Sequence, residues 1–279
     1  MSSVSEKVGE FYDKNAQDEW ERLDRHRTEF EVTMKALREF LPEAPRRLLD
    51  VGGGPGRYSI ALARLGYSVT LFDLSQGCLE FAQQKSKELG VELSATVRGN
   101  ALSLRDFAEE TFDVVLLMGP LYHLLNENDR RQAVSEARRV LKPNGILFAT
   151  VISRYAPIRW CAKNEPEWFE TFGKEILETG IWAGPETSPS TARVGFTASY
   201  FALPSELVPL MESEGFRTLS LIGCEGAVSL IEERINELNQ DRFEAWVELN
   251  YVIGKDSIFR GTAEHLLYIG RKPSMLTRS

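Results

Sequence analysis

Large apolar side chains recur at helical spacing among charged residues over the first 45 positions of the chain. One face of a helix can hold them: Phe11, Tyr12, Trp20, Leu23, Phe30, Met34, Leu37 and Phe40. Pro42 and Pro45 follow, and proline does not continue a helix. The pattern predicts a solvated helical segment over residues 1–45, which we expect to act as a lid on the rest of the chain.

Short apolar runs then alternate with stretches of helical composition. The expected strands cover residues 47–52, 68–73, 95–100, 112–118 and 145–152. The helices between them cover residues 57–65, about 76–89 and about 129–141. This alternation predicts a parallel sheet, and the wholly apolar fourth and fifth strands are typical of central strands covered on both faces.

After residue 153 the alternation gives way to a stretch rich in Trp, Pro, Gly and Ser, which predicts an inserted cap over residues 154–203. Its aromatic residues form either the core of that cap or an aromatic substrate pocket: Trp160, Trp168, Trp182 and Tyr200. The remaining elements belong to the core, which we expect over residues 46–153 and 204–279.

The C-terminal part of the core is expected to add a helix and a pair of strands. The helix has Ser205 as its N-cap and Gly215 as its stop, and a strand at 218–222 follows. A polar helical segment over 230–251 precedes a last strand at 265–270.

The end of the first strand carries the motif D-x-G-x-G-x-G. It consists of Asp50, Gly52, Gly54 and Gly56. Glycine lets the backbone approach a ligand closely, but the last glycine lies one position too early for a dinucleotide turn, so we expect a nucleoside without phosphates. Asp73 closes the second strand, where its carboxylate can accept hydrogen bonds from both ribose hydroxyls. Asp50 either orients the ligand or caps the turn.

Further motifs follow in a fixed order: Gly99-Asn-Ala, Phe112-Asp-Val-Val and Arg138-Arg-Val-Leu-Lys-Pro-Asn-Gly. With them the chain resembles the class I S-adenosylmethionine-dependent methyltransferases, over roughly Phe11 to Lys272 and most strongly from Leu48 to Ser153. The resemblance implies an α/β, Rossmann-like, seven-stranded and mostly parallel sheet whose last strand is antiparallel. It also implies S-adenosylmethionine as cofactor, bound above the carboxyl ends of the strands.

The resemblance assigns cofactor contacts to several positions. Gly52, Gly53 and Gly54 would line the methionine part, and Asp73 would bind the ribose. The adenine would contact Leu74, Ala101 and Asn100, and Met118 would give backbone contacts near the sulfonium. Asn100 stands where the family frequently has Asp, but its carbonyl oxygen can still accept a hydrogen bond from the adenine amino group.

Two further groups have a functional and a structural interpretation. His123 and Tyr122 follow the fourth strand and face the cofactor; His123 is a candidate general base or a structural histidine, and Tyr122 a candidate substrate contact. Tyr12, Trp20 and Arg22 either form a lid over the cofactor, with the arginine near its carboxylate, or belong to a helix that packs its aromatic side on the domain.

Charge and composition limit the classes of binding partner that we expect. The chain has 33 Lys and Arg against 41 Asp and Glu, a net charge of −8, so neither nucleic acid nor an anionic membrane is an expected partner. Three scattered cysteines and three histidines show no metal-ligand spacing, so no metal is expected. The first residues lack an apolar segment behind a positive end, which predicts a cytoplasmic protein without a secretory signal.

These observations favour a methyltransferase that acts on a small metabolite or an amino-acid-derived compound at O, N or C. Met118-Gly-Pro-Leu-Tyr departs from the Asn/Asp-Pro-Pro-Tyr pattern of enzymes that methylate nucleic-acid bases. Two alternatives remain open at this point. The cofactor itself could be the substrate of a ring closure that releases methylthioadenosine, or the chain could be a non-catalytic, S-adenosylmethionine-binding regulatory protein.

Overall fold

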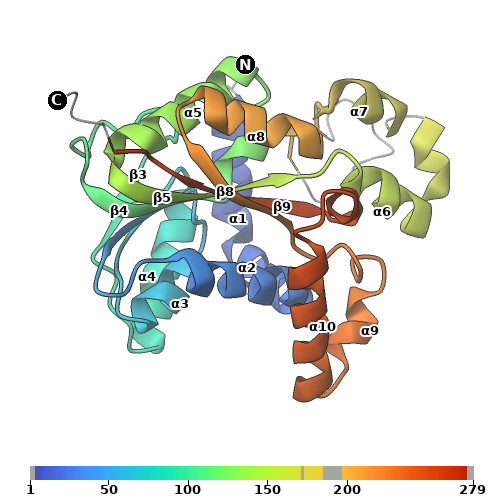
Figure 1. Cartoon of the computed structure of the whole chain (residues 1–279), viewed down its shortest axis with the longest axis horizontal. Helices are drawn as coiled ribbons and strands as arrows, with labels where there is room; N and C mark the ends of the chain where they lie inside the picture. Colours follow the sequence, from blue (N-terminus) through green and yellow to red (C-terminus); the bar gives the residue numbers. More distant parts are fainter. Residues whose placement is uncertain (1–3, 171–172, 185–196, 275–279) are drawn as a thin grey trace.

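A seven-stranded sheet with the order β3-β2-β1-β4-β5-β9-β8 forms the centre of the protein in the computed structural model (Figure 1), which describes residues 4–170, 173–184 and 197–274. Its strands are β1 (Arg47–Val51), β2 (Ser68–Asp73), β3 (Ala95–Arg98), β4 (Phe112–Leu117), β5 (Leu141–Ile152), β8 (Arg217–Gly223) and β9 (His265–Arg271). The first five run parallel, and β9 is antiparallel to both of its neighbours. The predicted α/β, Rossmann-like fold with an antiparallel last strand is therefore confirmed.

Helices cover both faces of this sheet. On one face lie α5 (Glu127–Val140) and α8 (Pro204–Ser213), and on the other lie α2 (Arg27–Phe40), α3 (Arg57–Arg64) and α10 (Gln240–Ile253) (Figure 1). Helix α4 (Gln76–Glu88) packs beside β2 and β3. Because both faces are covered, Val114 to Leu117 of β4 are completely buried, which explains the uninterrupted apolar run in the sequence.

The N-terminal segment is not one continuous helix, because its backbone leaves the helical region at Asn15 (φ −120°, ψ 20°) and again at His26. Helix α1 (Val4–Arg25) ends before His26, whose backbone leaves the helical region at φ −105° and ψ 55°, and α2 begins at the next residue. Helix α1 packs along α4, and α2 packs along α10. After the break at His26 the chain leaves the carboxyl edge of the sheet, and α2 runs along the face that α3 and α10 also cover.

Three predicted boundaries in the core are wrong. Ser205 does not cap α8: the N-cap is Leu203, Pro204 takes the first helical position, and the Glu206 carboxylate accepts a hydrogen bond from the Leu203 N–H at 3.0 Å. The segment predicted as one helix at 230–251 is divided into α9 (Glu232–Asn236) and α10. Asn239 caps the second of these by accepting a hydrogen bond from the backbone of Arg242. Helix α5 begins two residues before the expected start, because Asn126 caps it.

The segment predicted as a cap leaves and rejoins the core at one place. Arg154 N–H donates to the carbonyl of Ala202 at 2.8 Å, and Ser153 forms a parallel bridge with the same residue. Its described elements are α6 (Ala156–Asn164), η2 (Pro166–Glu170), α7 (Gly173–Thr179), β6 (Ile181–Trp182) and β7 (Ser199–Tyr200). Two further 3-10 turns, η1 (Pro120–His123) and η5 (Phe259–Thr262), follow β4 and precede β9.

Candidate functional site

The glycine motif shapes the floor of a cavity above the carboxyl ends of β1, β2, β3 and β4, which we call the glycine-loop cavity. Gly54 has a φ of +53°, and a side chain there would project into open space. Gly53 is required for a different reason, since an added Cβ would lie 2.5 Å from an Asp50 carboxylate oxygen. The loop therefore presents bare backbone to the cavity and packs tightly on its other side.

Asp73 is the carboxylate most directly associated with this loop. One of its oxygens accepts a hydrogen bond from the Gly54 N–H and the other from the Ser75 N–H, both at 2.8 Å. Burial raises the pKa of Asp73 to about 6, although these backbone hydrogen bonds oppose the shift. Each carboxylate oxygen keeps a further lone pair, so the group can still accept hydrogen bonds from a ligand.

Asp50 lies deeper, beneath the loop. It is buried and accepts a hydrogen bond from the Ser59 hydroxyl at 2.7 Å. Burial raises its pKa to about 7. Asp50 thus borders the cavity while its carboxylate supports the glycine loop.

The residues predicted as site residues converge on this cavity. Those that line it are Tyr12, Arg22, Asp50, Gly52, Gly53, Gly54, Asp73, Leu74, Asn100, Ala101, Met118, Tyr122 and His123. Trp20 does not line it: its ring packs against Phe81, and the guanidinium of Arg57 lies 4.8 Å from the ring centroid. The side-chain oxygen of Asn100 accepts a hydrogen bond from the Leu102 N–H at 2.9 Å.

His123 and Tyr12 form a partly buried polar pair at the wall of the cavity. Nε2 of His123 lies 2.9 Å from the Tyr12 hydroxyl, and Nδ1 lies 3.0 Å from the Thr197 hydroxyl. Burial lowers the pKa of His123 to about 4. With this pKa and both ring nitrogens in contact with hydroxyl groups, His123 is a weak proton acceptor in this arrangement.

A second cavity lies at the same edge of the sheet, above the end of β5 and the start of β9, and we call it the β9 cavity. It is lined by Phe11, Tyr12, Asn15, Asp18, Glu19, Arg22, Arg25, Tyr122, Ile152, Ala156, Pro157, Trp160, Ile176, Trp182, Phe201, Glu264 and His265. Tyr12, Glu19, Arg22 and Tyr122 border both cavities, so the two are neighbours across a shared wall.

The aromatic residues of the segment at 154–203 have different surroundings, and Trp182 belongs to a small buried cluster with Ile176 and Phe201. Trp160 and Trp182 line the β9 cavity. Trp168 stacks on Trp160 with ring centroids 5.5 Å apart. Tyr200 instead lies beneath the guanidinium of Arg130. Of the charged residues of this cavity, sequence reasoning identified Arg22 but not Asp18, Glu19, Arg25, Glu264 or His265, because none of these belongs to a motif.

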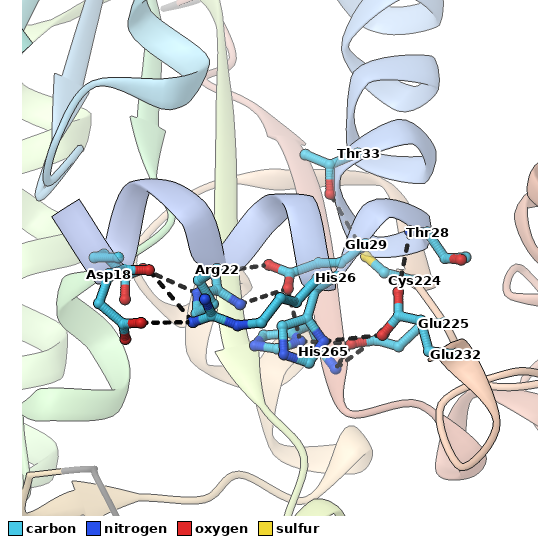
Figure 2. Close-up of polar contacts among 12 residues, drawn as sticks. Asp18, Arg22, His26, Thr28, Glu29, Thr33, Cys224, Glu225, Glu232 and His265 are labelled. Atoms are coloured by element: carbon cyan, nitrogen blue, oxygen red, sulfur yellow. Dashed lines mark hydrogen bonds and ion pairs between the residues drawn. The ribbon is translucent and has the colours of Figure 1, made fainter. Parts of the chain in front are cut away.

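An ion-pair network forms part of the wall between α1 and β9 (Figure 2). Arg22 donates hydrogen bonds to Glu19 at 2.9 Å and to Glu29 at 2.7 Å. His265 Nδ1 lies 2.5 Å from a Glu225 oxygen and 3.5 Å from a Glu29 oxygen. Burial alone would lower the pKa of His265, but the two carboxylates outweigh it and raise this pKa to about 9. His265 is therefore protonated at neutral pH.

The donor atoms of Glu29, Glu225 and His265 lie within 4.8 Å of one another, as in a metal site. A metal ion at this place would have to displace the imidazole proton of His265 and compete with Arg22 for Glu29. Burial would raise the pKa of Glu29, yet Arg22 and His265 hold it at about 2. The charges thus balance one another as an ion-pair network.

Comparisons with known proteins assign the domain. Residues 49–149 match the family described as a methyltransferase domain. The ubiquinone biosynthesis O-methyltransferase of Shewanella pealeana is 28% identical over 209 residues, which are 75% of each chain. The protein of the same name from Xanthomonas axonopodis is 36% identical over 126 residues, 44% of this chain and 50% of that protein. The chain thus matches about half the length of some curated relatives.

Solved structures show the same fold. A SAM-dependent methyltransferase from Methanosarcina mazei aligns with 85% of this chain and 97% of its own, with a TM-score of 0.57 and 22% identity. One from Thermotoga maritima aligns with 94% of this chain and 99% of its own, with a TM-score of 0.58 and 19% identity. Within the described part of the chain, no helix combines the length and apolar character that crossing a membrane requires.

Proposed function

The chain belongs to the class I S-adenosylmethionine-dependent methyltransferases, whose cofactor is S-adenosylmethionine, and on this premise we propose that it methylates a small acceptor. The acceptor is a metabolite or an amino-acid-derived compound that is methylated at O, N or C. It occupies the β9 cavity while the cofactor occupies the glycine-loop cavity.

The shared wall of the two cavities is the observation that carries this proposal. S-adenosylmethionine would supply the methyl group for an in-line displacement, in which the acceptor's electron pair would bond to the methyl carbon, the electrons of the broken carbon–sulfur bond would go to sulfur, and a proton carried by the acceptor atom would pass to water. The reacting atoms must therefore meet at a boundary between the two ligands. Tyr12, Glu19, Arg22 and Tyr122 supply such a boundary.

The glycine-loop cavity has the chemical groups that the cofactor needs. Gly52, Gly53 and Gly54 leave room for the methionine part, and Asp73 offers lone pairs to the ribose hydroxyls. The adenine would contact Leu74, Ala101 and Asn100, and Met118 would lie beside the sulfonium.

Residues at the boundary would position the reactants. Arg22 uses three of its five N–H donors on Glu19 and Glu29 and keeps two for the methionine carboxylate. His123 would hold the Tyr12 hydroxyl in place rather than remove a proton, because burial lowers its pKa to about 4. Acceleration would then come mainly from orientation and from the exclusion of water.

The domain roles follow from the same arrangement. Residues 1–45 would act as the lid, 154–203 as the cap, and 46–153 with 204–279 as the core that binds the cofactor. The described cysteines are all unpaired thiols, which supports a reducing, cytoplasmic location. The net charge of −8 argues against a nucleic-acid substrate.

The test is to follow the fate of the cofactor by chromatography. Purified protein is incubated with S-adenosylmethionine alone and then with amino acids, phenols and indoles. We expect S-adenosylhomocysteine only when an acceptor is present. Methylthioadenosine formed without acceptor, above the spontaneous background, would instead indicate ring closure, and an unchanged cofactor would indicate a binding protein.

A further inference from the structure

Glu264 is a carboxylate that lines the β9 cavity. Its backbone carbonyl accepts a hydrogen bond from the Ser153 N–H at 2.7 Å, which fixes it at the carboxyl edge of the sheet. Its side chain is partly buried and lines the cavity, and it makes no hydrogen bond or ion pair with any residue in the described ranges. A partly buried carboxylate whose acceptor positions are open can bind a cationic ligand group.

The cations around Glu264 are already paired with other carboxylates. His265 is held by Glu225, and His26 lies 2.9 Å from Glu232. Burial raises the pKa of Glu264 to about 7; the carboxylates of Glu225 and Glu232 add to this shift, and His265 and His26 oppose it. The electrostatic environment of Glu264 therefore favours an additional positive charge.

Aromatic rings form the facing walls of the cavity. Trp160, Trp182 and Phe201 line it, and Trp182 and Phe201 are buried. Indole faces attract cations and also pack well against flat apolar groups. Apolar walls together with one unpaired carboxylate suit a compact organic cation with an apolar body.

We propose that the acceptor is a small amine, bound as its ammonium ion to Glu264 with its apolar body against Trp160 and Trp182. This inference rests on the proposed function, since it assumes that the β9 cavity holds the acceptor. Glu264 lines the β9 cavity but not the glycine-loop cavity. The ammonium group is therefore an anchor, and the methylated atom is a different atom of the acceptor that reaches the boundary near Tyr122.

The test compares amines with neutral compounds of the same shape. Tyramine and 4-ethylphenol form one pair, and tryptamine and 3-ethylindole form the other. Calorimetry with protein saturated in S-adenosylhomocysteine should give about ten- to a hundredfold tighter binding of the amine in at least one pair, as expected for a charge-assisted contact. Glu264→Gln should remove this preference. Glu244→Gln, at an exposed position on α10, should retain it.

A proton-release measurement separates a direct contact from a structural effect. Near neutral pH a bound ammonium ion would favour the ionised form of Glu264, so amine binding should release protons in the wild type and not in Glu264→Gln. Calorimetry in two buffers with different ionisation enthalpies measures this release. Equal affinity for amine and neutral compound in both pairs, or no binding of either amine to the wild type, would overturn the inference.

The affinity for S-adenosylhomocysteine distinguishes the two proposals. If wild-type protein binds it and shows no amine preference, only the inference about Glu264 fails. If wild-type protein does not bind it, the proposed function fails. The same measurement on Glu264→Gln reports whether that variant keeps a folded cofactor site.

Discussion

Replacing Asp73 with alanine should largely abolish the stabilisation that S-adenosylmethionine gives to the folded protein. The carboxylate would accept charge-assisted hydrogen bonds from the ribose hydroxyls, and it holds the Gly54 N–H at 2.8 Å. Removing such a pair costs about 2 to 4 kcal/mol of binding free energy. This loss corresponds to a dissociation constant about thirty- to a thousandfold higher.

The expected thermal shift follows from these values. At a ligand concentration a hundredfold above the dissociation constant, binding stabilises the folded state by about 2.7 kcal/mol. At the same concentration the variant would retain less than about 1 kcal/mol. For a chain of this size 1 kcal/mol corresponds to roughly 2–4 °C, so a rise of roughly 5–10 °C should shrink to less than about 4 °C.

Calorimetry on the ligand-free and ligand-bound proteins separates binding from folding. Asp73→Ala also removes the acceptor for two backbone N–H groups, so its melting temperature without ligand must be measured first. Asp106→Ala is the matched control, because Asp106 is exposed and lies outside the cavity. Unchanged affinity in a folded Asp73→Ala protein would refute the assignment of Asp73 to the ribose.

The ion-pair network, the lid and the glycine loop give three further predictions. The free energy of unfolding should fall as pH rises from about 6.5 to about 9, because folded His265 keeps a proton that the unfolded chain has lost. Denaturant titrations at several pH values measure this dependence, and His265→Gln should make it weaker. Deleting residues 1–25 should leave the sheet folded by circular dichroism but lower turnover roughly tenfold or more, because α1 lines both cavities; wild-type turnover would contradict the lid. Gly53→Ala should destabilise the protein by about 1 to 3 kcal/mol, since its Cβ would meet the Asp50 carboxylate, and unchanged thermal stability would argue against the tight packing of the loop.

The sheet could be predicted from the sequence because its central strands are buried on both faces. Burial on both faces leaves an uninterrupted apolar run, such as Val114 to Leu117, that is visible without knowledge of its neighbours. Helix boundaries were less predictable because several local signals compete. At α8, Ser205 was expected to be the N-cap. The helix instead begins one residue earlier, because Pro204 occupies the first helical position and Glu206 accepts a hydrogen bond from the backbone N–H of the N-cap, Leu203.

The two cavities also differ in how well their residues could be predicted from the sequence. The glycine-loop cavity is built largely from residues at or shortly after the ends of strands, such as Gly54, Asp73 and Met118, whose places in the sequence motifs identify them. The β9 cavity draws on α1, the end of β5, the segment after it and the start of β9. Ile152 and His265 are 113 positions apart in the sequence and meet only through the antiparallel register of β5 and β9. The pattern of residues along the chain does not show which residues of β5 and β9 pair, so it could not predict this cavity.

Arg22 links the two cavities to the ion-pair network. It lies on α1, borders both cavities, and donates to Glu29 of α2, whose carboxylate is also 3.5 Å from His265 at the start of β9. Moving α1 would therefore disturb contacts that border the β9 cavity as well as those that cover the glycine-loop cavity. Because Glu29 is buried, loss of Arg22 would leave its charge balanced mainly by His265 at 3.5 Å, which is costly. The network thus favours the position that α1 has in the structure, and if residues 1–45 act as the proposed lid, its opening would also reshape the β9 cavity.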